Sequence, residues 1–319
     1  MLVSDPKRPS RALVIGSRGQ DGRIMSQILL KKGYEVMGVV RENSMLSNSQ
    51  NEFTEYDSDL SDATCFSKLL REVEPDHIFH FGAVHANSRD MPELEQSQSD
   101  EMLKCHVNIT QNILEWQTRN SCTSLIALSS LIYTPQLPKH EVSVEEPFNP
   151  QNYYGRTKLQ ALKHIREYRR KFNVKSAGLI LFNHSSEFSK PEFLIPSIAS
   201  NLLNAHRSGK RTLIKNSQQL VDVSNAHEFC SGFYKIIEKE LYGDFIFSSG
   251  NLRSIQSLYV DAINRLNPSL ISLFEFDDLG AHSPSMFGNI ERTRSILDWR
   301  GGGDSIDIIE KIFKAKIYE

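Results

Sequence analysis

Residues 12–22 read Ala-Leu-Val-Ile-Gly-Ser-Arg-Gly-Gln-Asp-Gly. An apolar run precedes the first glycine, and Met25, Ile28 and Leu29 recur at helical spacing after the last one. This order predicts a strand, a glycine turn and a helix. The glycines allow the turn to approach a pyrophosphate closely, and the amides at the start of the helix meet its charge. The stretch therefore predicts a dinucleotide-binding loop; the alternative is a glycine-rich turn without a ligand.

Predicted strands and helices alternate along the first half of the chain. Apolar runs at residues 34–40, 77–83, 125–128 and 174–181 predict further strands, and a shorter strand ends near Tyr56. Strands that alternate with helices form parallel sheets. We therefore expect an α/β fold of the Rossmann type, a doubly wound parallel sheet whose ligands lie outside the carboxyl ends of the strands.

The regular alternation fades after residue 182. We expect residues 1–182 to form the dinucleotide-binding Rossmann domain, with a returning segment near residues 220–250. Residues 183–319 are expected to form mostly a smaller C-terminal substrate-binding lobe. The sequence contains no internal repeat and no low-complexity tract that would change this plan.

The composition is that of an ordinary soluble globular protein. The chain has 319 residues, of which 39% are hydrophobic and 24% are charged, and its formal net charge is -2. This charge gives no support for a nucleic-acid surface. The four cysteines lack the spacing of a zinc site or a disulfide framework, so we expect no metal and a reducing cytoplasm. No apolar run has the length of a signal sequence or a membrane span, so neither secretion nor membrane insertion is expected.

Charged residues near the predicted loop bear on the choice between NAD and NADP. Arg41 and Glu42 end the second predicted strand, about twenty residues beyond the glycines, where an acid binds a ribose hydroxyl and an arginine a 2′-phosphate. Arg18 within the loop adds a second cation. We therefore predict NADP as the cofactor, with NAD as the alternative. Solvated charges at a strand end are the purely structural explanation.

Residues 152–158 read Asn-Tyr-Tyr-Gly-Arg-Thr-Lys and begin a helical pattern. Tyr154 and Lys158 lie four residues apart, and therefore on the same helix face. A close ammonium lowers the pKa of a phenol, so that the phenol can exchange a proton with an alcohol near neutrality. The pair predicts oxidation of an alcohol or reduction of a carbonyl group; the alternative is a surface helix with this spacing by chance.

Four motifs carry a resemblance over nearly the whole chain. They are Gly-Gln-Asp-Gly at 19–22, Lys-Gly-Tyr-Glu-Val at 32–36, Tyr-Gly-x-x-Lys-Leu at 154–159 and Leu-Phe-Asn-His at 181–184. Together they resemble the extended short-chain dehydrogenases/reductases of the NAD(P)-dependent nucleotide-sugar epimerase/dehydratase group, and most closely the GDP-mannose 4,6-dehydratases. The resemblance implies an enzyme that uses NAD(P) on a nucleotide-activated sugar.

The resemblance also implies roles for single residues. Tyr154 would be the acid/base at a sugar hydroxyl, Lys158 would bind the nicotinamide ribose, and Ser129 would hydrogen-bond the reacting oxygen. The expected cofactor-binding residues are Gly16, Arg18, Gly19, Gln20, Asp21, Gly22, Arg41, Asp59, Leu60, Gly82, Ala83, Tyr154 and Lys158. The expected substrate-binding residues are Ser130, Asn183 and His184. His184 is equally compatible with a packed, hydrogen-bonded histidine.

Three positions depart from the dehydratase pattern. Leu131 stands where the dehydratases carry the glutamate that removes the C5 proton, and a leucine cannot act as a base. Val221 and Leu279 stand where relatives carry arginines that bind the substrate diphosphate. Four basic residues either replace those contacts or form a solvated basic face: Arg207, Lys210, Arg211 and Lys215.

We therefore expect hydride transfer at a ring carbon, C4, of a nucleotide-activated hexose, by a 4-keto reductase or an epimerase. One alternative is a GDP-mannose 4,6-dehydratase-type lyase whose base comes from elsewhere, with Glu187 and Glu145 as candidates. The other is a non-catalytic or regulatory protein that binds the cofactor. Relatives suggest a homodimer or higher homo-oligomer, in which Leu159, Leu162 and Ile165 pack between subunits or else against the protein's own sheet.

Overall fold

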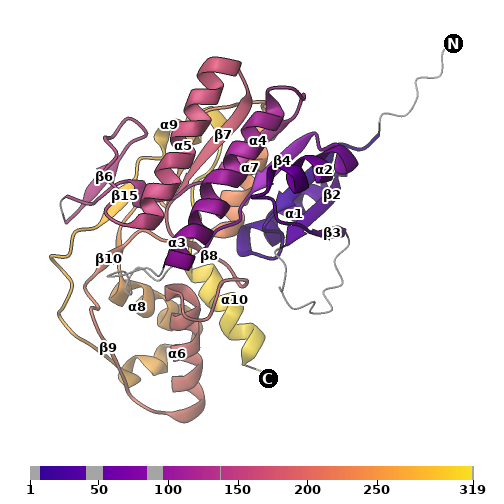
Figure 1. The fold of residues 1–319 in the computed structure, drawn as a ribbon. Helices are drawn as coiled ribbons and strands as arrows, with labels where there is room; N and C mark the ends of the chain where they lie inside the picture. Colours follow the sequence, from indigo (N-terminus) through magenta and orange to yellow (C-terminus); the bar gives the residue numbers. More distant parts are fainter. Residues whose placement is uncertain (1–7, 41–52, 85–95, 137, 318–319) are drawn as a thin grey trace. The chain divides into compact units, whose positions relative to one another are not determined.

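Seven strands form the main sheet, in the order β12-β7-β5-β4-β1-β2-β3. Figure 1 labels β7, β4, β2 and β3 of this sheet. The computed structural model describes residues 8–40, 53–84, 96–136 and 138–317. The strands are β1 (Arg11–Ile15), β2 (Glu35–Val40), β3 (Thr54–Asp57), β4 (His77–His80), β5 (Thr123–Ala127), β7 (Lys175–Leu181) and β12 (Asp244–Phe247). The pairings that connect β7, β5, β4, β1, β2 and β3 are all parallel. Because β2 and β4 flank β1 on opposite sides, the strand order reverses there, as the predicted Rossmann-type fold requires.

Helices connect these strands. They are α1 (Gln20–Lys31), α2 (Ala63–Val73), α3 (Gln96–Leu103), the π-helix η1 (Lys104–Asn108), α4 (Ile109–Gln117), the 3-10 helix η2 (Ser130–Ile132) and α5 (Tyr153–Phe172). Helices α4 and α5 lie side by side (Figure 1). The π-helix η1 lies between α3 and α4 and interrupts the α-helical backbone there. The fourth strand was predicted to reach Ala83 but ends at His80.

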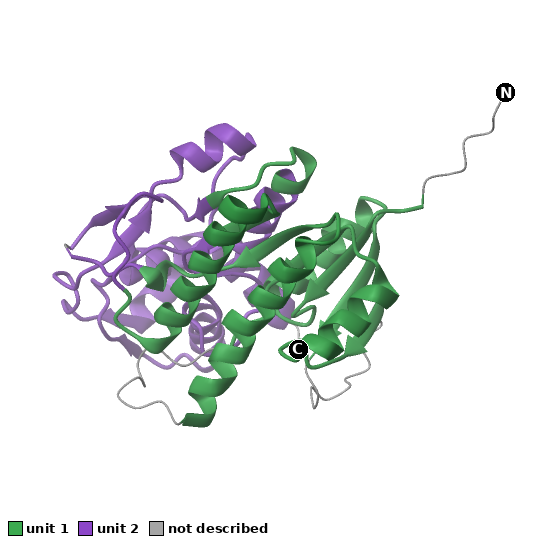
Figure 2. Ribbon diagram, turned by 45° about the horizontal axis from the view of Figure 1, so that its top comes forward, with its two compact units in different colours: residues 1–132, 150–179, 236–244 green, residues 133–149, 180–235, 245–319 purple. Residues whose placement is uncertain are grey.

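The chain divides into two compact units, coloured green and purple in Figure 2. Unit 1 comprises residues 1–132, 150–179 and 236–244, and unit 2 comprises residues 133–149, 180–235 and 245–319. Unit 1 therefore contains the glycine loop, the end of β5 and all of α5.

The strands at the centre of the unit 1 sheet are almost completely buried. All five residues of β5 and four of the five in β1 are buried, as expected for strands covered on both faces. Leu159, Leu162 and Ile165 of α5 are 9%, 0% and 0% exposed. These three side chains are buried within a single chain. They therefore agree with packing against the protein's own sheet and not with packing between subunits.

A buried carboxylate anchors α5. Asp244, at the start of β12, is 7% exposed and accepts hydrogen bonds from Arg166 Nε at 2.6 Å and Arg169 Nη2 at 2.5 Å. Both arginines come from the second half of α5. The ion pairs therefore fix the rotation of the helix that carries Tyr154.

Unit 2 is built from short strand pairs and helices. Its strands are β6 (His140–Val142), β8 (His184–Ser185), β9 (Thr212–Ile214), β10 (Leu220–Val221), β11 (Ser224–Asn225), β13 (Arg253–Ser254), β14 (Phe274–Phe276) and β15 (Met286–Gly288). Its helices are α6 (Leu194–Ser208), most of α7 (Ala226–Glu238), α8 (Ile255–Leu266), η3 (Pro268–Leu273), α9 (Glu291–Leu297) and α10 (Ile306–Lys316). Helices α6, α8 and α10 enclose an apolar core around Ile198, Leu258 and Ile309.

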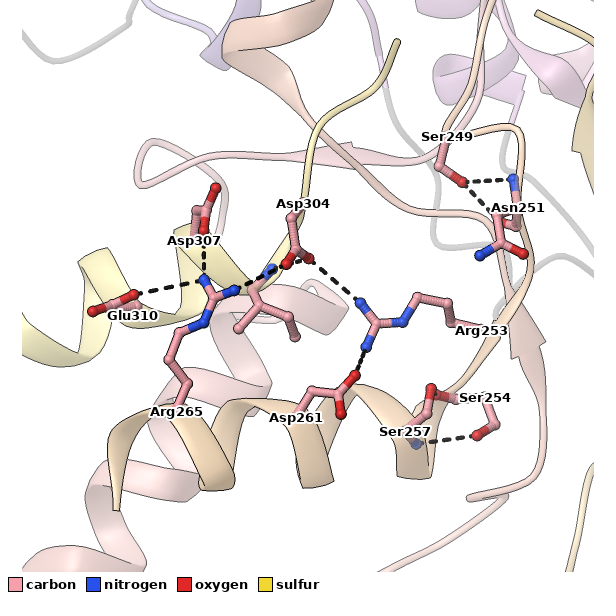
Figure 3. A network of polar contacts seen from close by, with 11 residues as sticks. Ser249, Asn251, Arg253, Ser254, Ser257, Asp261, Arg265, Asp304, Asp307 and Glu310 are labelled. Carbon is pink, nitrogen blue, oxygen red and sulfur yellow. Dashed lines mark hydrogen bonds and ion pairs between the residues drawn. The ribbon is translucent and has the colours of Figure 1, made fainter. Parts of the chain in front are cut away.

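Two arginines connect α8 with the segment that leads into α10 (Figure 3). The Arg253 guanidinium contacts Asp261 and Asp304. Arg265 contacts Asp304 at 3.2 Å and Asp307 at 2.5 Å. Within the described ranges, no helix is both long enough and apolar enough to cross a membrane.

Candidate active site

The glycine loop joins β1 to α1 in a tight turn. Gly16 has a φ of +84°, and a Cβ on it would lie 2.9 Å from the backbone nitrogen of Gly82. A Cβ on Gly22 would lie 2.1 Å from the carbonyl oxygen of Gly16. Side chains are therefore excluded at both positions. The bare backbone forms the kind of cradle that approaches a pyrophosphate, so this loop fits a dinucleotide.

Helix α1 starts directly at this loop. Gly19 is its N-cap and has no side chain to accept a hydrogen bond from the first turn. Gln20 and Asp21 occupy that turn, where the Gln20 amide donates to the Asp21 carboxylate at 3.2 Å. The positive end of the helix dipole thus faces the loop, as anion binding requires.

Arg18 is held by Glu55 of β3. Arg18 Nε and Nη2 donate to Glu55 Oε2 at 3.1 and 2.8 Å, and Ser17 Oγ donates to Glu55 Oε1 at 2.9 Å. The two charged side chains are only 19% and 13% exposed. No sequence pattern indicated Glu55, because its partner lies far away along the chain. Arg41, predicted to act together with Arg18, lies outside the described residues.

The predicted cofactor-binding residues Asp59, Leu60, Gly82 and Ala83 follow β3 and β4. Asp59 is exposed and accepts the amide hydrogen of Ser61 at 2.9 Å, whereas Leu60 is 2% exposed and belongs to the core of unit 1. Gly82 and Ala83 come directly after β4, and Gly82 faces Gly16 of the loop. These residues lie just past the carboxyl ends of their strands, which is the edge where this fold binds ligands.

Tyr154 and Lys158 lie in the first turns of α5. The helix begins here because the Asn152 carboxamide oxygen accepts the amide hydrogen of Gly155 at 2.7 Å, a typical N-cap. Lys158 Nζ lies 5.8 Å from the centroid of the Tyr154 ring. Tyr154 is 8% and Lys158 2% exposed. The structure thus brings together the two groups that the sequence singled out.

Burial dominates the acid–base behaviour of this pair. Desolvation raises the pKa of Tyr154 above its ordinary value, which corrects the expectation that the ammonium lowers it. Burial also lowers the pKa of Lys158 to about 8, although Cys105 works in the opposite direction. The Lys158 ammonium donates to the carbonyl oxygen of Ala127 at 2.9 Å. Tyr154 is therefore in its protonated form at neutral pH.

Ser129 and Ser130 follow β5 and lead into η2, which packs on α5. Ser129 Oγ accepts the amide hydrogen of Leu131 at 3.2 Å. A Cβ on Gly155 would lie 2.2 Å from the carbonyl oxygen of Leu131. Only glycine therefore allows η2 to approach the first turn of α5 so closely. This contact brings the serine segment next to the helix turn that carries Tyr154.

His106 in η1 is a neighbour of Tyr154 that the sequence pattern did not reveal. Its Nε2 accepts the amide hydrogen of Val84 at 3.2 Å, so that nitrogen carries no proton. Its Nδ1 then donates to Thr157 Oγ1 at 2.8 Å, and the Thr157 hydroxyl donates to the Tyr154 carbonyl oxygen at 2.9 Å. A histidine inside a helical pattern resembles an ordinary packed residue, so only the fold reveals this chain of contacts.

Comparison with known proteins defines the family. A model of the NAD dependent epimerase/dehydratase family matches residues 12–245, which is more than half of the chain. The chain belongs to this family. GDP-mannose 4,6 dehydratase of Cricetulus griseus is 24% identical to it over 284 residues, which cover 84% of this chain and 75% of the relative. GDP-mannose 4,6-dehydratase of Yersinia enterocolitica is 27% identical over 257 residues, covering 75% and 68%.

Solved structures agree on the fold of this epimerase/dehydratase. The dTDP-glucose 4,6-dehydratase of Bacillus anthracis, in complex with NAD, has a TM-score of 0.78 at 16% identity and covers 96% of both chains. The UDP-glucuronic acid 4-epimerase of Bacillus cereus, in complex with NAD, has a TM-score of 0.74 at 18% identity and covers 97% of this chain and 100% of that one. The family is NAD-dependent, and the chain is an enzyme of the extended short-chain dehydrogenase/reductase type.

The predicted substrate residues Asn183 and His184 of this epimerase/dehydratase lie in unit 2. Asn183 is exposed, and its carbonyl oxygen accepts the amide hydrogen of Ser224 at 2.9 Å. His184 Nδ1 donates to the Phe182 carbonyl oxygen at 2.8 Å, and its ring lies 4.8 Å from the Phe229 ring. These contacts are those of a packed, hydrogen-bonded histidine.

Val221 and Leu279, which stand where relatives carry phosphate-binding arginines, also lie in unit 2. Val221 pairs with Arg253 across β10 and β13, but the Arg253 guanidinium is already matched by Asp261 and Asp304 (Figure 3). Arg253 and Asp304 line a cavity of about 250 Å³. Leu279 is 61% exposed. The basic residues considered as substitutes are all exposed, in agreement with a solvated basic face: Arg207, Lys210, Arg211 and Lys215.

Glu187, considered as a relocated dehydratase base, is part of an ion-pair cluster in unit 2. His227 Nε2 and Lys311 Nζ contact its carboxylate at 2.9 and 2.7 Å. Burial works to raise the pKa of Glu187, but these hydrogen bonds outweigh it, and the pKa is lowered. A carboxylate stabilised in this way is a weak base. Within the part of the chain that the structure describes, no three side chains of His, Cys, Asp or Glu gather as they would around a metal ion.

Proposed function

We propose that this NAD-dependent epimerase/dehydratase transfers hydride at a ring carbon, C4, of a nucleotide-activated hexose, as a 4-keto reductase or an epimerase. The observation that carries the proposal is the close approach of η2 to the first turn of α5 at Gly155. It places the segment of Ser129 and Leu131 next to the turn that carries Tyr154. The assembled groups are an acid, a cation and a hydroxyl, with a leucine where a dehydratase would need a base.

In the reductase direction, the oxygen of a C4 ketone accepts a proton from Tyr154 as hydride reaches the carbon. The phenol is protonated at neutral pH, as this step requires. The Lys158 ammonium stabilises the tyrosinate that remains. Ser129 Oγ accepts from the Leu131 amide, so its own hydrogen is left to donate to the same substrate oxygen. NAD(H), when bound at the glycine loop, supplies or accepts the hydride.

In the oxidative direction, the tyrosinate form of Tyr154 receives the hydroxyl proton of the sugar. An epimerase combines the two directions on one sugar and restores the cofactor. Neither direction removes a proton from a ring carbon, so neither needs the carboxylate that Leu131 replaces. The arrangement therefore supports reduction or epimerisation more directly than elimination of water.

The dehydratase alternative requires another base, and the two candidates are poorly suited. Glu187 is stabilised as a carboxylate by His227 and Lys311, and Glu145 is an exposed side chain in unit 2. For neither glutamate does an observation point to removal of the sugar C5 proton. We therefore keep the 4,6-dehydratase as the second candidate only because the curated relatives with 24% and 27% identity carry that name.

The ion pair of Arg18 and Glu55 bears on the cofactor preference. The sequence alone favoured NADP, on the basis of Arg18 and Arg41. Arg18 pairs with Glu55, which offsets its charge, and the NAD dependence of the family is a separate argument for NAD. We propose NAD(H) as the preferred cofactor.

The proposed partners are a nucleotide-activated sugar and a second copy of the chain. The relatives' names support the first, since they act on GDP- or other nucleotide-activated sugars. The homodimer stays a prediction. Its interface would involve residues other than Leu159, Leu162 and Ile165, which are buried in the core of unit 1.

A panel of GDP-, UDP- and dTDP-hexoses and their 4-keto derivatives tests the proposal. The purified protein is mixed with each sugar and with NADH or NAD, and the nicotinamide absorbance and the product are followed. We expect turnover with at least one sugar and no product that has lost water. Cofactor binding without a response to any sugar would instead favour a non-catalytic cofactor-binding protein.

A further inference from the structure

We propose that Glu55 makes the protein discriminate against the 2′-phosphate of NADP, by holding Arg18 in a buried ion pair. The inference rests on the proposed function only in that the glycine loop binds a nicotinamide dinucleotide. It concerns neither the sugar nor the reaction.

The backbone gives Glu55 direct access to the glycine loop. Glu55 in β3 lies opposite Gly38 in β2, which is the strand next to β1. Gly38 has no side chain, and a Cβ on it would lie 2.6 Å from Ser17 Oγ. The space above Gly38 is thus filled by the Ser17 side chain and the Phe53 ring. Any larger residue at position 38 would obstruct the contact between β3 and the loop.

Both oxygens of the Glu55 carboxylate are engaged. Oε2 accepts two hydrogen bonds from Arg18, and Oε1 accepts one from Ser17, which is itself 2% exposed. The geometry orients the guanidinium towards β3. Because the pair is 19% and 13% exposed, removing Arg18 from it would take a charge-assisted partner from a largely buried carboxylate.

NAD and NADP differ in charge at the 2′ position of the adenosine ribose. In this fold the adenosine ribose lies near the glycine loop, and an arginine there accommodates the 2′-phosphate of NADP. A phosphate that used Arg18 would have to displace Glu55 or lie close to its negative charge, and both are unfavourable. The 2′-hydroxyl of NAD is neutral and leaves the pair intact. Glu55 therefore penalises NADPH and leaves NADH binding nearly unchanged.

The test is a titration of the full-length protein with NADH and with NADPH, followed by nicotinamide fluorescence or calorimetry. We expect the wild-type protein to bind NADH more tightly. Glu55→Gln preserves the size of the side chain and the hydrogen bond from Ser17 while it releases the Arg18 charge. This variant is expected to bind NADPH about tenfold more tightly, the effect of one charge-assisted contact, with NADH affinity changed by less than about threefold.

Arg18→Gln tests the other half of the pair. It removes the Arg18 charge from the Glu55 carboxylate, so NADPH affinity is expected to fall by about tenfold relative to NADH affinity. The matched control is Glu35→Gln, which removes the same charge from an exposed pair with Arg11 in the neighbouring strand. This control should leave both affinities unchanged, and circular dichroism checks that each variant is folded.

Two results overturn the inference. One is a wild-type protein that prefers NADPH, and the other is a ratio of NADH to NADPH affinity that Glu55→Gln leaves unchanged. In either case the proposed hydride transfer still stands, since a dinucleotide is bound. If neither dinucleotide binds the wild-type protein, both the inference and the proposed function are wrong.

Discussion

The ring of His106 meets the ring of Tyr154 edge to face, with centroids 5.1 Å apart and planes at 83°. His106 is 1% exposed, and its two nitrogens are fixed by Val84 and Thr157. Its ring packs directly against that of Tyr154, the proposed proton donor. We therefore regard it as a residue that positions Tyr154.

Replacing His106 tests this positioning role. His106→Leu keeps the bulk but loses both hydrogen bonds, so the Tyr154 ring and the Val84 backbone lose a common support. We expect kcat to fall at least about tenfold, because small displacements of a reacting group are expensive in rate, while KM and NADH affinity stay within about threefold. His106→Gln, which keeps a donor and an acceptor, should recover part of kcat. Equal kcat in the Leu and wild-type proteins would refute the role.

Gly155→Ala tests the contact between η2 and α5. The added methyl group would lie 2.2 Å from the Leu131 carbonyl oxygen, so the two segments must separate. We expect the free energy of unfolding to fall by about 1–3 kcal/mol and turnover to fall with it. Gly209→Ala is a useful comparison: its Cβ meets nothing within 4 Å, and only its left-handed φ of +66° opposes the change. Urea denaturation should show the larger loss for Gly155→Ala, and the reverse order would be inconsistent with this packing.

His80 predicts a pH dependence of stability. Burial, together with the charge of Lys158, lowers its pKa from 6.5 to about 3, while Nε2 donates to the Cys105 carbonyl oxygen at 2.9 Å. Between these two pH values the unfolded chain binds a proton that the folded protein does not. The free energy of unfolding should therefore fall as pH decreases from 6.5 towards 3, by about 1.4 kcal/mol per pH unit from this group.

The measurement is urea unfolding of the wild-type protein and of His80→Asn at several pH values in this window. The variant is expected to be less stable at neutral pH. On acidification its free energy of unfolding should fall less steeply, because it lacks the one proton that His80 takes up on unfolding. Identical slopes in the two proteins would show that His80 titrates normally.

The ion pairs of Asp244 predict that removing a buried charge costs more stability than removing an exposed one. Asp244→Ala leaves Arg166 and Arg169 without their buried partner, so we expect a loss of about 3 kcal/mol in the free energy of unfolding. Glu167→Ala removes a pair with Lys171 on the same helix, where both side chains are nearly half exposed, and should change stability by less than about 0.5 kcal/mol. Similar losses in both variants, measured by chemical denaturation, would contradict this interpretation of α5.

The sequence predicted the parts of this fold that depend on local pattern. The apolar run before Gly16, the glycine spacing and the apolar stripe after it predicted β1, the loop and α1, because each signal lies within a few residues. The spacing of Tyr154 and Lys158 predicted their common face for the same reason. These features are set by the periodicity of strands and helices.

Contacts between distant segments could not be predicted in the same way. Glu55 meets Arg18 only because β3 lies two strands from β1, and His106 meets Tyr154 only because a π-helix precedes α4. The direction of the Tyr154 pKa shift was also wrong at the sequence level. Residue spacing shows the nearby ammonium, but burial, which raises the pKa of Tyr154, is a property of the folded chain.

The central claim is that Tyr154 supports hydride transfer without loss of water. It is tested by product analysis of the wild-type, Tyr154→Phe and Tyr153→Phe proteins. The substrate is the nucleotide sugar that responds in the panel. Tyr153 is the neighbouring half-buried tyrosine on a different face of α5 and serves as the matched control. We predict a reduced or epimerised hexose that has lost no water, no turnover by Tyr154→Phe with NADH binding retained, and near-normal turnover by Tyr153→Phe. A 4-keto-6-deoxy product, or a Tyr154→Phe protein that turns over at the wild-type rate, would contradict this mechanism.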